Sequence, residues 1–132
     1  MAEGKFATAI NCMDGRTQQP VIDWLKEHRG VDYVDMITEP GPDGIMALRQ
    51  ADLVAQIKTR VLISVEKHGS ETIMIVAHGD CAGNPVGKDE HLSHLRRAME
   101  LVRIWALPVE VIGVWLDEPD WVVDVVATIS KP

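Results

Sequence analysis

The chain contains two cysteines, and each stands in a short polar cluster directly after an apolar run. Cys12 opens the cluster CMDGR at residues 12–16, and His78 and Cys81 belong to the cluster HGDC at residues 78–81. Two thiolates and one imidazole are ligands that zinc prefers, and they leave one tetrahedral position for water or a carboxylate. These residue types indicate a zinc centre for hydrolysis or hydration.

Two strands are needed to bring the clusters together, because no local loop joins residues so far apart in the chain. Residues 6–10 and 73–77 are apolar runs typical of strands that are buried on both faces of a parallel sheet. Each cluster then follows the carboxyl end of its strand, where open α/β sheets bind their ligands. We therefore expect two adjacent parallel strands to form one site from both clusters.

Three other uses of the cysteines remain open. A disulfide between Cys12 and Cys81 is one, although the sequence shows no signal peptide. A nucleophilic cysteine in a phosphate-binding loop is another, but residues 81–87 contain no arginine and Arg16 follows Cys12 too closely. The third is a pair of buried structural thiols near a hydrogen-bonded histidine, which the presence of both clusters at strand ends disfavours.

Strands and helices alternate along the rest of the chain. Pro20 suits the first turn of a helix that Gly30 ends, and residues 31–37 form a second predicted strand. We expect residues 40–44, which are rich in proline and glycine, to be irregular. A further helix is predicted over residues 89–106. A long helix before it, ended by Gly69, has an apolar face that contains Val54, Ile57, Val61 and Val65.

The end of the chain predicts two strands, at residues 109–116 and 121–129, joined by a tight turn that allows only antiparallel pairing. The predicted fold class is therefore α/β, a mainly parallel sheet flanked by helices with a C-terminal antiparallel edge strand. Trp115 and Trp121 then lie either at a subunit contact or against the core, and both alternatives remain open.

Length and composition suit one domain over residues 1–132. The formal charge of -7 argues against binding to nucleic acid, because no cluster of Lys and Arg outweighs the acidic residues. No apolar stretch has the length of a membrane span. We expect a cytoplasmic protein that binds neither nucleic acid nor a membrane.

Together the two clusters resemble the signature of the β-class carbonic anhydrases, Cys-x-Asp-x-Arg followed later by His-x-x-Cys. Cys12, Asp14, Arg16, His78 and Cys81 carry this signature. The resemblance extends from about residue 5 to the end of the chain. It implies a β-carbonic anhydrase-like fold and a homodimer or a higher homo-oligomer.

The chain also differs from the family pattern. Family members begin with a helical arm, and here the first predicted strand starts almost at Met1, so we expect a short, divergent member without the arm. Residues 38–42 replace an Arg-Asn-Ala-Gly segment, and Ala82 stands where the family has a glycine. The metal site is therefore expected to be retained and the substrate pocket to be altered.

The resemblance implies zinc-dependent hydration of CO2 to bicarbonate by a metal-bound hydroxide, with Zn2+ held by Cys12, His78 and Cys81. It also implies that Arg16 holds Asp14, and that Asp14 accepts the proton of the zinc-bound water or serves as a fourth ligand. In an extended segment these two side chains share a face. A hydrolase of COS or CS2 and a catalytically silent zinc protein are the alternatives.

Other polar residues receive simpler interpretations. His91 and His94 stand three apart on a predicted helix without an obvious acidic or thiol partner, so we expect them at the surface, and a secondary role in shuttling protons stays open. We expect Gly15, Gly79 and Gly83 to let the backbone approach the metal closely.

Overall fold

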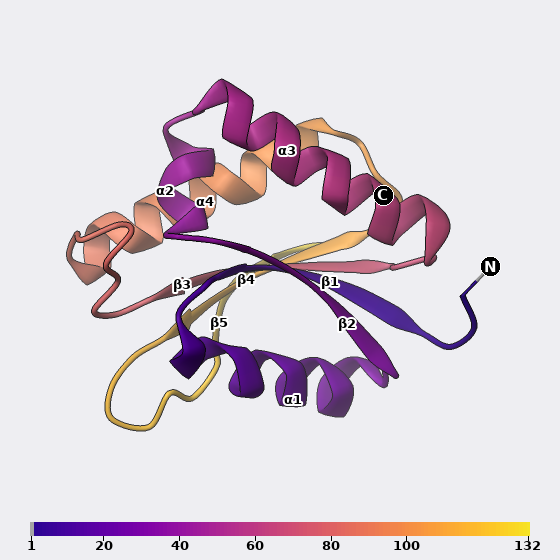
Figure 1. The fold of residues 1–132 in the computed structure, drawn as a ribbon, viewed down its shortest axis with the longest axis horizontal. Coiled ribbons are helices and arrows are strands. Elements are labelled where there is room, and N and C mark those ends of the chain that lie inside the picture. Colours follow the sequence, from indigo (N-terminus) through magenta and orange to yellow (C-terminus); the bar gives the residue numbers. More distant parts are fainter. Residues whose placement is uncertain (1) are drawn as a thin grey trace.

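The computed structural model describes residues 2–132, in which five strands form one sheet in the order β2-β1-β3-β4-β5 (Figure 1). The strands are β1 (Phe6–Cys12), β2 (Tyr33–Glu39), β3 (Thr72–His78), β4 (Glu110–Leu116) and β5 (Asp124–Ile129). The first four are parallel to one another, and β5 pairs antiparallel with β4 at the edge. The predicted fold class is confirmed.

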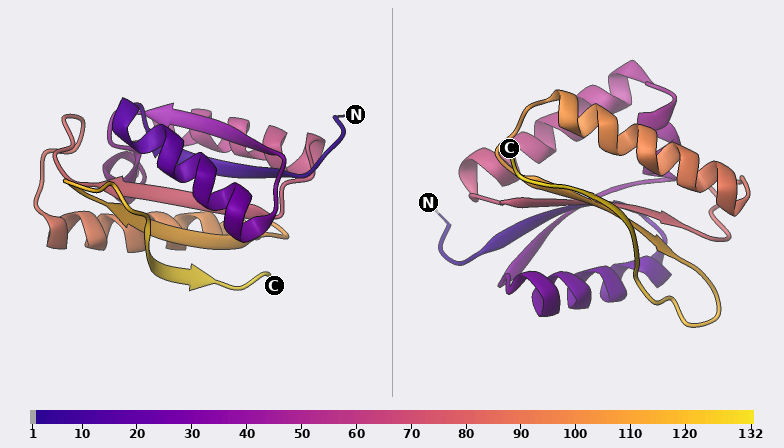
Figure 2. Two further views of the ribbon diagram at one scale, coloured as in Figure 1. Left: turned by 90° about the horizontal axis from the view of Figure 1, so that it is seen from below. Right: turned by 180° about the vertical axis from the view of Figure 1, so that it is seen from behind.

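Helices cover both faces of the sheet. One face carries α1 alone, and the opposite face carries the other helices (Figures 1 and 2). The helices are α1 (Gln18–Arg29), α2 (Pro42–Ala47), α3 (Ala51–Leu62) and α4 (Lys88–Ile104), with a 3-10 turn η1 (Gly15–Thr17) and a π-helical turn η2 (Ile63–Lys67). Within residues 2–132, no helix has both the length and the apolar character needed to cross a membrane.

Successive side chains of a strand point to opposite sides of the sheet. In the central strands the side chains on both sides are mostly apolar and buried. In β1, Ala9 packs into the core under α1 with Leu25, whereas Ile10 packs into the core on the other side with Ile57. Each fully buried aliphatic side chain of this kind contributes about 1.5–3 kcal/mol to folding. Burial on two sides thus holds the carboxyl ends of β1 and β3 in place.

The expectation of an irregular segment at residues 40–44 is wrong in part, because α2 begins at Pro42. Gly41, with φ of +62°, reverses the chain after β2, and Pro42 then stands in the first turn of the helix. The backbone N–H groups in the first turn of a helix have no partner within the helix. Proline, which lacks an N–H, therefore loses no hydrogen bond at this position and is favourable there. The proline and glycine therefore mark a helix start.

The strand predicted at residues 121–129 is shorter, since β5 begins at Asp124 and residues 117–123 form a loop. Of the two alternatives for the tryptophans, packing against the core is observed. Trp115 is buried in the core beside α4, and Trp121 packs partly buried against the core on the side of α1.

Candidate metal centre

Cys12 and His78 are the last residues of the neighbouring parallel strands β1 and β3, and Cys81 lies in the loop after β3. Their ligand atoms lie within 4.8 Å of one another, and the two sulfur atoms are 4.0 Å apart. All three side chains are buried. The sheet topology thus brings together the three residues predicted as metal ligands, and this group could hold a metal ion.

The imidazole of His78 is oriented by its own backbone neighbour. Its Nδ1 donates to the carbonyl oxygen of Gly79 at 2.7 Å, so that in the neutral imidazole the lone pair is on Nε2. This Nε2 is buried and has no hydrogen-bond partner among the described residues. An unsatisfied buried polar atom costs about 1–3 kcal/mol, a cost that a metal ion bound to Nε2 removes. The donor set therefore fits a metal with the preferences of zinc.

Contacts among the three side chains shift the pKa of each. The Cys12 and Cys81 sulfur atoms are in hydrogen-bonding contact, and this contact, with His78 nearby, lowers the pKa of Cys12 although burial opposes the change. The same contact and burial raise the pKa of Cys81. Burial lowers the pKa of His78, but its contacts with Cys12 and Gly79 raise it more. The metal-free group therefore keeps protons that a metal ion displaces on binding.

Asp14 and Arg16 form the predicted pair, but through a tight turn and not through an extended segment. The Asp14 carboxylate accepts from the backbone N–H of Arg16 at 2.9 Å and so caps η1. The Arg16 guanidinium donates to both carboxylate oxygens, at 3.0 and 2.7 Å. These hydrogen bonds lower the pKa of Asp14 to about 2. Asp14 is therefore ionised at neutral pH and lies two residues from Cys12.

Residues 2–127 match the model of a family described as "Putative carbonic anhydrase". The chain belongs to this family. The fold matches a structure titled "Crystal structures of two tetrameric beta-carbonic anhydrases from the filamentous ascomycete Sordaria macrospora", with a TM-score of 0.57 and 12% sequence identity, over 98% of this chain and 84% of that chain. No curated protein matches the sequence. The predicted relationship to the β-class carbonic anhydrases is confirmed.

In this carbonic anhydrase family member, the loop of residues 117–123 also reaches the Asp14–Arg16 pair, which the sequence did not predict. The Arg16 guanidinium lies 4.6 Å from the ring centre of Trp121 and 3.3 Å from a carboxylate oxygen of Glu118. It also lies 3.2 Å from the carboxylate of Asp80. Trp121 has a φ of +51°, which is strained for a bulky residue and is found where tertiary contacts hold the chain. No local pattern distinguishes Trp121 from an ordinary core residue.

The three glycines expected to let the backbone approach the metal differ in the space around them. A Cβ on Gly79 would lie 1.9 Å from the carboxylate of Asp117, and a Cβ on Gly83 would lie 2.4 Å from the carbonyl carbon of Pro40. A Cβ on Gly15 would meet nothing within 4 Å. Two of the glycines therefore permit close packing between loops of the protein.

The expectation that His91 and His94 lie at the surface is wrong. His91 is 1% exposed, and its Nδ1 donates to the buried Asp43 carboxylate at 2.6 Å. His94 is also buried, and its Nδ1 accepts from the side-chain amide of Asn84 at 3.0 Å. Their partners come from segments distant in sequence, so the pattern of α4 alone could not reveal them.

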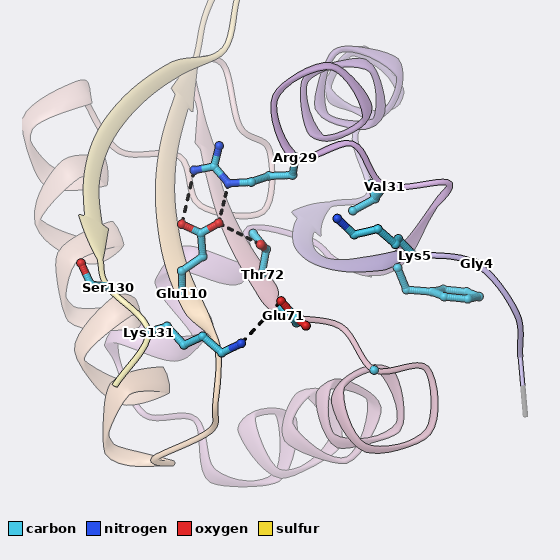
Figure 3. A pocket seen from close by; sticks show the side chains of 11 residues that line it. Gly4, Lys5, Arg29, Val31, Glu71, Thr72, Glu110, Ser130 and Lys131 are labelled. Atoms are coloured by element: carbon cyan, nitrogen blue, oxygen red, sulfur yellow. Dashed lines mark hydrogen bonds and ion pairs between the residues drawn. The ribbon is translucent and has the colours of Figure 1, made fainter.

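A cavity of about 390 Å³ lies at the opposite, amino ends of the strands (Figure 3). On one wall, Arg29 and Thr72 donate to the carboxylate of Glu110, and on the other Lys131 lies 3.5 Å from Glu71. None of the residues predicted for the site lines this cavity. The candidate site therefore lies at the carboxyl ends of the strands, where open α/β sheets bind their ligands.

Proposed function

We propose that this protein catalyses the zinc-dependent hydration of CO2 to bicarbonate. The proposal is carried by the buried Nε2 of His78, which has no hydrogen-bond partner within residues 2–132 and belongs to a group with two thiols, in a chain of the carbonic anhydrase family. The ionised Asp14, held by Arg16 next to the ligand Cys12, supports the same chemistry.

Cys12, His78 and Cys81 would hold the zinc ion and leave a fourth position open. Zinc in such a site brings the pKa of a coordinated water near 7. The chain contributes the orientation of the ligands: the carbonyl oxygen of Gly79 accepts from Nδ1 of His78, which leaves Nε2 to bind the metal. Burial of all three side chains keeps bulk water from competing for them.

Asp14 would act as a hydrogen-bond acceptor for the reacting water. With a pKa of about 2 it carries no proton at neutral pH, so its oxygens can orient the O–H bond that is to be broken. Asp14 does not belong to the group whose ligand atoms lie within 4.8 Å of one another, which favours this role over that of a fourth ligand. Arg16 keeps the carboxylate in position through two side-chain hydrogen bonds.

We also propose that the protein forms a homo-oligomer. The β-carbonic anhydrases of the structural match are described as tetrameric, and the fold is shared with them. The substrate would be a small molecule, CO2 or bicarbonate, with COS and CS2 as the isoelectronic alternatives.

A stopped-flow assay of CO2 hydration on zinc-loaded protein, from about pH 6.5 to 9, tests the proposed function, because this range brackets the expected pKa near 7. Wild type should be active. Asp14→Asn should keep its zinc but lose about 100-fold or more in rate, since an amide is a poorer acceptor for the water proton. The zinc content of both proteins is measured in parallel.

Asp23→Asn is the matched control, because Asp23 is an exposed carboxylate on α1 that accepts from Gln19. This variant should retain wild-type activity. Fully zinc-loaded wild type that hydrates no CO2 anywhere in the range would contradict the proposal. Hydrolysis of COS in the same experiment would then assign the hydrolase, and inactivity toward both substrates would indicate a silent zinc protein.

A further inference from the structure

Two histidines on α4 each bind a different segment of the protein, one at the start of α2 and one in the loop after β3. His91 and His94 lie about one helical turn apart and therefore on the same side of the helix. His91 donates to Asp43, in the first turn of α2, at 2.6 Å. His94 accepts from Asn84, in the loop after β3, at 3.0 Å. One helix thus contacts two segments that are distant in sequence.

These two segments pack against each other with little free space. A Cβ on Gly41 would lie 2.7 Å from the Cβ of Asn84, and a Cβ on Gly44 would lie 2.8 Å from the Asn84 side-chain amide. A Cβ on Gly83 would lie 2.4 Å from Pro40. Because real Cβ atoms do not approach so closely, the glycines are what allows this contact. The position of one loop therefore determines the position of the other.

Both segments continue directly into the ligand positions. Cys12 is the register partner of Glu39, the last residue of β2, and the backbone N–H of Met13 donates to Glu39 at 3.1 Å. The segment from residue 40 to 44 follows at once. On the other side, Asn84 belongs to the short loop that also contains Cys81. A shift of either segment would therefore change the separation of the two thiols.

We propose that His91 and His94 are positioning residues of the metal centre: by holding Asp43 and Asn84, α4 fixes the two segments that set the distance between Cys12 and Cys81. The inference rests on the proposed function in one respect, that the centre binds a metal. The contacts of His91 and His94 are present without it. Neither histidine is a ligand, because neither belongs to the Cys-His-Cys group.

The environment of His91 supports a role beyond packing. Its Nε2 is buried and has no hydrogen-bond partner among residues 2–132, and Asp43 is as deeply buried as the imidazole. An apolar side chain would fill this position without leaving an unsatisfied nitrogen. The retained polar pair is therefore better explained by the directional contact with Asp43 than by burial.

The test compares His91→Leu, which removes the donor, with His91→Asn, whose amide can replace Nδ1 as a donor. Cobalt(II) is the probe, because its absorption reports both binding and thiolate coordination. We expect His91→Leu to weaken cobalt binding at least tenfold and to change the sulfur-to-cobalt absorption band. His91→Asn should restore much of the affinity and the band.

Leu95→Ala is the matched control for a purely structural effect. Leu95 is a fully buried apolar residue on the same helix that packs in the core next to Gly113 of β4 and offers no hydrogen bond to Asp43 or Asn84. Leu95→Ala should lower the Tm while leaving the cobalt affinity and spectrum close to those of wild type. If His91→Leu lowers the Tm but binds cobalt like Leu95→Ala, the positioning role is overturned. If His91→Leu does not fold, Asp43→Asn weakens the same contact more mildly and replaces it.

Hydrogen exchange on the metal-free proteins separates this inference from the proposed function. His91→Leu should speed the exchange of amides in residues 40–44, and His94→Leu should speed that of residues 83–84, each beyond the change in Leu95→Ala. Unchanged exchange in these loops overturns the inference even if the wild type binds metal and is active. Wild type that binds no cobalt or zinc contradicts the proposed function, and the exchange data still decide the role of the histidines.

Discussion

At the scale of single residues, the direction in which a histidine nitrogen is held decides its chemistry. His78 and His91 both use Nδ1 for a short hydrogen bond, and both have a buried Nε2 that no group in the described part of the chain partners. Of the two, His78 belongs to a group with the Cys12 and Cys81 thiols, and within residues 2–132 His91 belongs to no such group. The same side chain thus serves as a candidate ligand in one case and as a support of the loops in the other.

The first prediction concerns the ligands. Purified protein should carry about one zinc ion per chain, and Cys12→Ser, His78→Ala or Cys81→Ser should each remove most of it, because two ligands hold zinc poorly. Elemental analysis measures the metal, and the zinc-loaded wild type should melt at a higher temperature than the variants. Met13→Ala, at an exposed position beside Cys12, is the control and should keep its zinc. Full zinc content in His78→Ala would exclude this residue from the ligand set.

Glu110 carries a prediction on pH and stability. Burial acts to raise its pKa, but the hydrogen bonds from Arg29 and Thr72 outweigh burial and hold the pKa below its ordinary value of 4.5. The carboxylate therefore stabilises the fold above the ordinary pKa, and the contribution is lost as the pH falls through the lowered one. We expect Glu110→Gln to lower the free energy of unfolding by about 1 kcal/mol at pH 7.

Chemical denaturation at pH 7 and at acidic pH measures this effect. The difference between wild type and Glu110→Gln should shrink as the solution becomes acidic, since protonation makes the two side chains alike. A constant difference across the range would show that the stabilisation does not depend on the charge of Glu110.

At the scale of elements, the centre is assembled where loops meet the ends of strands. Gly79 follows β3 immediately, and its backbone N–H donates to Leu116 at the end of β4, at 2.9 Å. The loop after β4 then packs Asp117 onto Gly79 and brings Trp121 to Arg16. The arrangement of Arg16 therefore depends on the contact between two loops.

Gly79→Ala tests this contact. Its Cβ would overlap the Asp117 carboxylate, so we expect a loss of about 1–3 kcal/mol in stability as the loop moves away. Gly15→Ala is the control, because the space around Gly15 is open, and it should change stability by less than about 0.5 kcal/mol. Equal thermal unfolding of the two variants would indicate that the loop moves without cost.

At the scale of the whole molecule, the sheet has two outer edges that are unpaired within residues 2–132, those of β2 and β5. Tyr33 and Val125, one on each edge strand, are large apolar residues that are about half exposed. Exposed edges with apolar side chains favour association between chains.

We therefore expect at least a homodimer in solution. Light scattering coupled to size exclusion, at micromolar concentration, should give a mass of two or more chains. A monomer under these conditions would contradict the predicted assembly. The predicted cytoplasmic location and the single domain over residues 1–132 stay predictions from the sequence.

The sequence by itself determined the sheet and the three candidate ligands. Apolar runs such as residues 73–77 specify buried strands locally, and a parallel sheet places the ends of neighbouring strands together whatever the loops do. Cys12, His78 and Cys81 could be chosen because thiols and imidazoles are rare and have few roles. Asp14 and Arg16 could be paired because they are neighbours in the chain.

The tertiary structure alone decided what surrounds them. Asp43 meets His91, and Trp121 meets Arg16, across separations in sequence that no local pattern encodes. The start of α2 at Pro42 and the close packing at Gly79 also depend on the segments placed opposite them. Periodicity reports which face of an element is apolar, but a polar contact between loops forms only when the packed core has fixed both partners in space.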